Sequence, residues 1–140
     1  MSHKTSVKTK LNNKEYLCKA LDELGYKYEV AEGNVLETRG KYRNTKSKVE
    51  ILIHETPNGN CNNEIGFAKK EDGTYETVGD FYFTHDINGS YEKKAEHLRN
   101  IVTTESKKLE LTDMLENYQF QLDQTEENDK ELELTFTCWE

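Results

Sequence analysis

The sequence predicts an α+β fold with a mixed, mostly antiparallel sheet and two or three helices on one face. One observation is a joint at residues 21–30, where an apolar helix face ends at Gly25 and an alternating strand follows at once. A similar joint occurs at residues 113–122, with Asn117 in place of the glycine. Because the same junction occurs twice, we expect pseudo-duplicated β-α-β halves around a central hairpin.

The totals favour a single domain over residues 1–140. Apolar residues make up 34% of the chain and keep clear periods, which is typical of a folded protein. No apolar run approaches the about 18 residues of a membrane helix, and the first eleven residues lack the apolar stretch of a signal peptide. Three irregularly spaced cysteines favour a reducing compartment, so we expect a cytoplasmic protein.

The first third of the chain predicts a strand, a helix and a second strand. Apolar and basic residues alternate over 7–11, which suits a half-buried strand. Asn12 or Asn13 then offers a side-chain oxygen to the start of a helix over residues 14–24. Gly25 suits the left-handed conformation that ends a helix, and residues 26–30 alternate as a strand.

The middle of the chain predicts mainly strands. We expect a short strand over residues 35–38, an alternating strand over 49–53 and a loop over 57–60. Residues 64–69 and 74–83 flank Asp72-Gly73, the strongest short hairpin signal in the chain.

The last third predicts two helices and two strands. The helices are expected from about Tyr91 to Val102 and over 106–116. A strand over 118–122, an acidic turn over 124–129 and an alternating strand over 132–138 complete the fold. The two joints make the whole similar to ferredoxin-like or ligand-binding regulatory domains, a likeness that carries no function by itself.

Residues 39–48, the basic segment, are the best candidate for a binding site. Although the net charge is −8, residues 1–48 hold 11 of the 19 Lys and Arg residues and only 6 of the 27 Asp and Glu residues. Arginine forks suit phosphate or carboxylate oxygens, and a tyrosine can stack on a ring. The candidate binding residues are Arg39, Lys41, Tyr42, Arg43, Lys46 and Lys48. The alternative is a solvated loop whose cations balance an acidic domain.

Metal and catalytic patterns are weak. Asp80, His85 and Asp86 are suitable ligand types and His97 follows them, but no spaced Cys or His pair accompanies them. We therefore expect no metal and no cofactor. Cys61 is placed in a polar loop after His54, where nothing supplies the third group of a catalytic set.

Several other chemically active side chains are expected in the interior or at an edge. Cys18 and Cys138 lie near apolar faces, where thiols are buried more often than reactive. Tyrosines 26, 28, 75 and 118 fall at strand spacing and are expected in the core. The acidic residues between 126 and 133 are expected to protect a sheet edge from aggregation.

Short motifs through the chain resemble a family described as conserved hypothetical chloroplast open reading frame 35, or domain of unknown function 1257. They are Met1-Ser2-His3, Val7-Lys8-Thr9, Leu24-Gly25-Tyr26, Gly40-Lys41-Tyr42-Arg43, Ile65-Gly66-Phe67, Tyr75-Glu76-Thr77-Val78-Gly79-Asp80 and Trp139. The resemblance implies cyanobacterial, plastid or phage relatives, a host-cytoplasm or stroma location, and no assigned activity. Phe81-Tyr82 stand where relatives often carry tryptophans, and Asn117 where they carry glycine.

These observations favour a non-enzymatic binding or accessory module whose basic segment contacts a protein or an anionic partner. The alternative is a nucleotide- or metabolite-binding protein, either a sensor or a phage sequestering protein. An enzyme is the least favoured class. The acidic total argues against general nucleic-acid binding, and the oligomeric state is left open.

Overall fold

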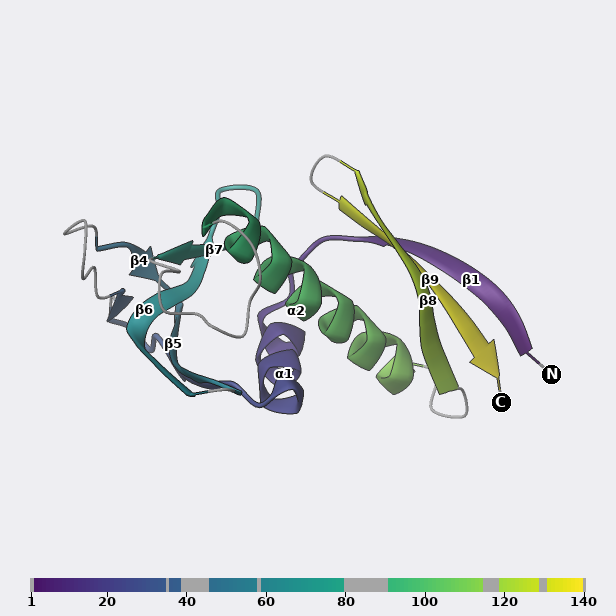
Figure 1. Cartoon of the computed structure of the whole chain (residues 1–140), viewed down its shortest axis with the longest axis horizontal. Helices are drawn as coiled ribbons and strands as arrows, with labels where there is room; N and C mark the ends of the chain where they lie inside the picture. Colours follow the sequence, from purple (N-terminus) through teal and green to yellow (C-terminus); the bar gives the residue numbers. More distant parts are fainter. Residues whose placement is uncertain are drawn as a thin grey trace. The chain divides into compact units, whose positions relative to one another are not determined.

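The structure is a computed structural model, and it describes residues 2–34, 36–38, 46–57, 59–79, 91–114, 119–128 and 131–139. The elements in chain order are β1 (Ser2–Thr9), α1 (Lys14–Leu24), β2 (Lys27–Val30), β3 (Leu36–Glu37), β4 (Lys48–Val49), β5 (Ile51–Thr56), β6 (Gly59–Lys69), β7 (Tyr75–Gly79), α2 (Tyr91–Met114), β8 (Gln119–Asn128) and β9 (Glu131–Trp139) (Figure 1). Every strand pair among these residues is antiparallel. The predicted α+β class is confirmed.

The chain forms two compact units. Unit 1 consists of Met1–Ala20 and Asn100–Glu140, and unit 2 is the continuous segment Leu21–Arg99. The single domain expected from the length stays a prediction, and each unit is described by itself.

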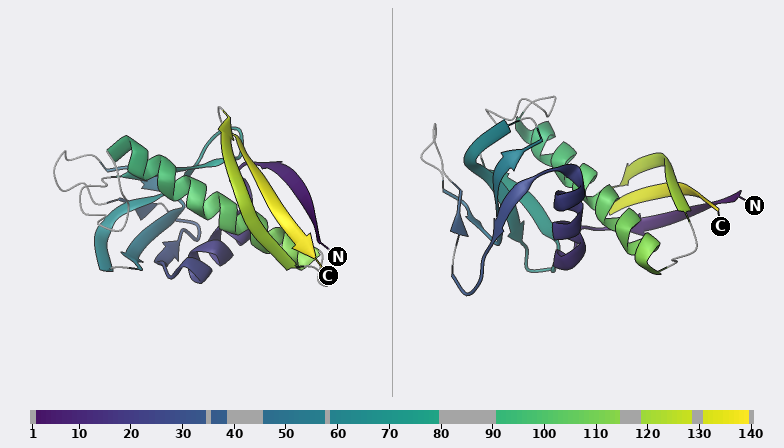
Figure 2. Two further views of the ribbon diagram at one scale, coloured as in Figure 1. Left: turned by 45° about the vertical axis from the view of Figure 1, so that its right-hand side comes forward. Right: turned by 90° about the horizontal axis from the view of Figure 1, so that it is seen from below.

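Unit 1 contains a three-stranded sheet in the order β1-β9-β8. Strand β1 pairs with β9 along its whole length, from Ser2 opposite Trp139 to Thr9 opposite Leu132. Figure 2 shows β9 in yellow between β8 and the purple β1. β1 and β9 are therefore neighbours in the sheet although more than a hundred residues separate them in the sequence.

The core of unit 1 follows the alternation of β9. Its even-numbered residues are buried and its odd-numbered residues are half-buried. The buried cluster is Leu132, Leu134, Phe136 and Cys138, with Val7 of β1 and Leu111 of α2 packed against it. Helix α2 thus contributes to the cover over one face of this sheet, and the predicted last strand is confirmed.

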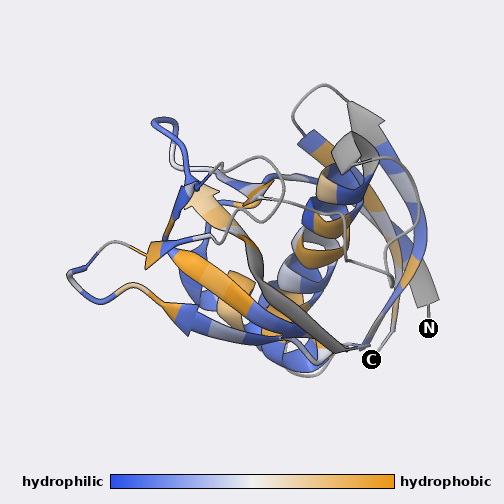
Figure 3. Ribbon diagram, turned by 60° about the vertical axis from the view of Figure 1, so that its left-hand side comes forward, coloured by the Kyte–Doolittle hydropathy of each residue, from blue (hydrophilic) through white to orange (hydrophobic). Residues whose placement is uncertain are grey.

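Unit 2 is built on a four-stranded sheet in the order β2-β5-β6-β7, beside the short pair β3-β4. The most apolar stretch is Ile51–Ile53 in β5, an interior strand (Figure 3). Leu52 is 7% exposed although alternation predicted a polar-facing position, so the interior strand β5 buries three successive residues, Ile51 to Ile53. The strand expected over 49–53 is also divided at Glu50, whose N–H donates to the Phe67 carbonyl.

Two glycine turns of unit 2 are confirmed. Gly25 has φ +84° and ends α1 in a Schellman motif, in which the N–H groups of Gly25 and Tyr26 donate to the carbonyls of Asp22 and Leu21. Gly73 has φ +87° in the β6–β7 turn, where the Asp72 carboxylate accepts the Thr74 N–H at 2.9 Å. At the other end of α1, in unit 1, the Asn13 side chain accepts the Tyr16 N–H at 3.3 Å, as expected of a helix cap.

The two helices predicted over 91–102 and 106–116 are wrong, because α2 runs without a break from Tyr91 to Met114. The residues at 103–106, between the two predicted helices, contain neither glycine nor proline to interrupt a helix. Thr104 instead donates its hydroxyl to the Asn100 carbonyl of the preceding turn at 2.8 Å.

Two predicted loops are also wrong. The acidic turn expected over 124–129 begins too early, because β8 continues to Asn128. The loop expected over 57–60 ends too late, because β6 starts at Gly59. Both stretches have loop-like composition, but pairing with a neighbouring strand overrides it.

The topology does not show the expected β-α-β halves. Strands β1 and β2, which flank α1, pair with β9 and β5 in different sheets. The second joint includes residues 115–118, which lie outside the described residues, as does the predicted strand end at 80–83.

Candidate functional site

The basic segment is only partly within the described residues. Lys46 and Lys48 are exposed, and Lys48 lies in β4 opposite Glu37 of β3. Arg39, Lys41, Tyr42 and Arg43 lie outside the described residues. Their predicted binding role stays a prediction.

A polar pocket in unit 1 is the strongest candidate site that the described residues form. Its volume is about 330 Å³, within the range of small-ligand sites. Strand β1 and the turn after it supply one wall, α2 a second and the start of β9 a third. The lining residues are Lys8, Thr9, Lys10, Asn12, Lys107, Glu110 and Glu131.

The pairing of β1 with β9 brings the lysines and glutamates of this pocket together. Lys10 follows the end of β1, and its Nζ lies 3.7 Å from Oε1 of Glu131 at the start of β9. On α2, the Lys107 Nζ lies 3.6 Å from Oε2 of Glu110, one turn further along. Lys107 is the least exposed of the four, at 19% of its side-chain surface.

The lining carries more positive than negative charge, with three lysines against two glutamates. Ion pairs as exposed as Lys10–Glu131 contribute only about 0–1 kcal/mol each. The glutamates therefore position the lysine ammonium groups but hold them only weakly. An anion with two or more charges can therefore replace a glutamate as the partner of a pocket lysine.

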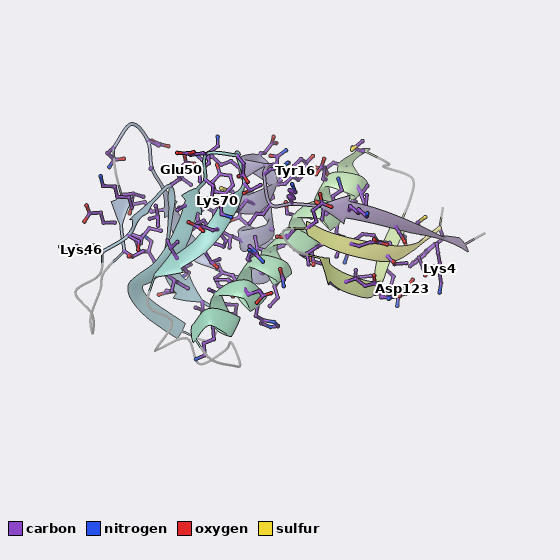
Figure 4. All side chains as sticks on the ribbon, turned by 90° about the horizontal axis from the view of Figure 1, so that it is seen from above. Lys4, Tyr16, Lys46, Glu50, Lys70 and Asp123 are labelled. Atoms are coloured by element: carbon purple, nitrogen blue, oxygen red, sulfur yellow. The ribbon has the colours of Figure 1, made fainter. Side chains whose placement is uncertain are left out.

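A second polar cluster links α1 to the end of α2 within unit 1. The Tyr16 hydroxyl (labelled in Figure 4) donates to Oδ2 of Asp113 at 2.9 Å, and the Lys19 Nζ lies 3.5 Å from the same oxygen and 3.3 Å from Glu15. The hydrogen bond to Asp113 raises the pKa of Tyr16, and the bond to Glu15 raises the pKa of Lys19. Both groups keep their protons more firmly than usual. This cluster is therefore suited to joining helices and poorly suited to supplying a base or nucleophile.

Most of the metal candidates named from the sequence lie outside the part of the chain that the structure describes. No group of three or more His, Cys, Asp or Glu side chains there has a metal-binding arrangement. Asp80, His85 and Asp86 lie outside that part, and His97 is exposed on α2. The described residues thus offer no support for a metal site.

The thiols and tyrosines mostly take the expected positions. Cys138 is buried at 3% exposure and Cys18 is half-buried. Cys61 lies in β6, so its predicted place in a loop is wrong. Tyr26 and Tyr75 are buried as predicted, Tyr28 is half-buried, and residue 118 lies outside the described residues.

Sequence reasoning missed the pocket. It read Lys8 and Lys10 only as the polar side of a strand, and about a hundred residues separate them from Lys107. The available signal was the combination of a basic first strand with a lysine- and glutamate-rich helix. The strand partner that joins them could not be identified from the sequence.

Among the described residues, neither helix is long and apolar enough to cross a membrane. No curated protein and no solved structure matches the chain. The family model described as "Protein of unknown function (DUF1257)" matches residues 20–135. Since this match covers most of the 140 residues, the chain belongs to the DUF1257 family, whose function is unknown.

Proposed function

We propose that the protein is a non-enzymatic binding module that takes a small anion, such as a phosphate or a nucleotide's phosphate group, into the pocket of unit 1. The observation that carries this proposal is the presence of three lysines in one cavity of about 330 Å³. Ammonium groups are strong donors to phosphate and carboxylate oxygens.

The chemistry of the lining favours binding over catalysis. Its charged groups are lysines and glutamates, four of which form ion pairs with one another. The Thr9 hydroxyl donates to the Lys10 carbonyl at 3.4 Å. A nucleophile would instead need a neighbouring base that accepts its proton.

The test is a titration with inorganic phosphate, pyrophosphate and ATP, followed by calorimetry and by amide chemical shifts. We expect binding by at least one of them, and weakening by at least tenfold in Lys107→Gln and in Lys10→Gln. Each substitution removes one charge-assisted hydrogen bond, which contributes about 1.5–3 kcal/mol. Lys69→Gln is the matched control, because this exposed lysine lies on β6 in unit 2.

Two results would contradict the pocket assignment. One is the absence of binding by all three anions at low ionic strength. The other is binding that Lys107→Gln and Lys10→Gln weaken no more than Lys69→Gln does.

A second proposal keeps the basic segment as a contact for a protein or anionic partner. Lys46 and Lys48 support it, because both are exposed, Lys48 in β4 and Lys46 shortly before it. Capture from the native host with mass spectrometry should identify a partner, and simultaneous replacement of Arg39, Lys41 and Arg43 by alanine should weaken its salt-sensitive binding. Unchanged affinity of the triple variant at low salt would refute this site.

The narrower resemblance to chloroplast open reading frame 35 proteins, with cyanobacterial, plastid or phage relatives, is also retained as a proposal. It is supported by the short motifs along the chain, such as Leu24-Gly25-Tyr26. We infer a cytoplasmic or stromal location on the same basis, and cell fractionation would test it.

A further inference from the structure

The two outer strands of the unit 1 sheet carry opposite charge. Among the described strands, β1 and β8 each have one neighbour, β9, so each presents an open backbone edge. Strand β1 contains Lys4 and Lys8 and no acidic residue. Strand β8 contains three acidic residues, two of them Asp123 and Glu126, and no basic residue.

The register and one side-chain hydrogen bond place these charges on the same face of the sheet. Lys4 lies opposite Thr137 of β9, and the Thr137 hydroxyl donates to the carboxylate of Asp123, although the β8 residue paired with Thr137 is Gln121. Figure 4 shows Lys4 and Asp123 at the same end of the sheet. Lys8, Glu133 and Glu126 form one row across the three strands. Lys8 thus shares a row with a carboxylate on β8, and Lys4 lies opposite the threonine that binds a second carboxylate, Asp123.

A β-bulge brings Asp123 onto the face of the sheet that carries both lysines. The register between β8 and β9 shifts between Leu122 and Gln124, which makes Asp123 the extra residue. In a regular strand, residues 123 and 126 would point to opposite faces because their separation is odd. With the bulge, both acidic side chains are on the face of Thr137 and Glu133, where Lys4 and Lys8 also lie.

The row of Lys8, Glu133 and Glu126 also contains an unfavourable contact. Glu126 and Glu133 lie directly opposite each other, and like charges at this position are destabilising. The Gln124 side-chain amide donates to Glu126 at 2.8 Å, but this group is neutral. A cation placed beyond β8 in this row would offset the repulsion.

We propose that the β1 edge of one molecule docks against the β8 edge of a second copy, so that the sheet continues from one molecule to the next. Both strands are antiparallel to β9, so β1 and the incoming β8 would run parallel. Lys8 would meet Glu126 of the second copy, and Lys4 would lie on the same face of the continued sheet as Asp123. The contact uses different surfaces on the two copies, so it generates rings or open chains.

The charges argue against the other two edge contacts. Contact between two β1 edges would bring lysines against lysines, and contact between two β8 edges would bring carboxylates against carboxylates. Like-charge contacts at an interface disfavour that partner. The same reasoning disfavours a highly acidic peptide on β8 or a basic one on β1.

Charge exchange tests the proposal in phosphate-free, low-salt buffer, which separates it from anion binding at the pocket. Sedimentation velocity should show a mass that rises above 16.3 kDa with concentration, up to about 1 mM, so that even weak association is populated. The double variants Lys4→Glu/Lys8→Glu and Asp123→Lys/Glu126→Lys should each remain monomeric. Their equimolar mixture should associate again, since each variant then offers edges complementary to the other.

The matched control is Lys14→Glu/Lys69→Glu, which changes the same charge at two exposed lysines that belong to neither edge strand and should associate like the wild type. Circular dichroism establishes that every variant is folded. A wild-type mass that stays at the monomer value would overturn the proposal. So would association that persists in both edge variants, or a folded mixture that does not recover it.

Discussion

Gly66 of β6 is a position where a single methyl group should have a large effect. It is buried, and it lies opposite Leu52 of β5 and Val78 of β7. A Cβ atom added there would lie 2.5 Å from the Ile51 carbonyl oxygen and 2.9 Å from Cγ1 of Val49. The variant Gly66→Ala therefore requires a neighbour to move.

The magnitude follows from which neighbour must move. Overpacking of a core typically costs about 1–3 kcal/mol. The closest atom belongs to the backbone of β5, an interior strand held by β2 and β6, so we expect the upper half of this range. For a chain of this size, a loss of about 2–3 kcal/mol corresponds to a decrease in Tm of roughly 6–10 °C.

Urea unfolding followed by circular dichroism measures this loss for Gly66→Ala, Val49→Ala and the double variant. Val49→Ala removes the Cγ1 contact but leaves the Ile51 carbonyl in place. The double variant should therefore lose only about 0.5–1 kcal/mol less stability than the sum of the two single losses. If Gly66→Ala were as stable as the wild type, the close approach would be refuted. If Val49→Ala removed the whole destabilising effect of Gly66→Ala, the role of the Ile51 carbonyl would be refuted.

Two further predictions concern tyrosine hydroxyls. Tyr75→Phe should lower the free energy of unfolding by about 1.5–3 kcal/mol, because the buried tyrosine donates to Oε2 of Glu50 at 2.9 Å. Equal free energies of unfolding for Tyr75→Phe and the wild type, measured by urea unfolding, would contradict this expectation. Because the pKa of Tyr16 is raised, its contribution to stability is present at neutral pH and lost as pH rises through the folded-state pKa, above 10.0. Asp113→Asn should move the Tyr16 titration in ¹³C NMR to lower pH, and an unchanged midpoint would refute the hydrogen bond as its cause.

The sequence predicted local structure where one residue or one period decides it. Gly25 stops α1 because few other residues adopt its positive φ without strain, and β9 alternates so regularly that its buried face is readable. The break predicted inside α2 is wrong because residues 103–106 contain neither glycine nor proline to interrupt the helix.

Strand partners and the pocket depend on contacts between distant residues, which explains why they were missed. Nothing local in residues 2–9 specifies β9 as the partner of β1. Without that pairing, Lys10 cannot be placed beside Glu131, nor Lys8 in a row with Glu126. The basic segment was readable as a cluster of charge, but its binding role remains untested.

The pairing of β1 with β9 also constrains the order of folding. β1 must wait for a partner more than a hundred residues later, whereas the β8–β9 hairpin and the sheet of unit 2 close over short segments. Since loop closure costs more conformational entropy for a longer loop, β1 should join last, after unit 2 has shortened the effective loop. During synthesis, the lysine-bearing strand would then remain available to other molecules until the end of the chain emerges.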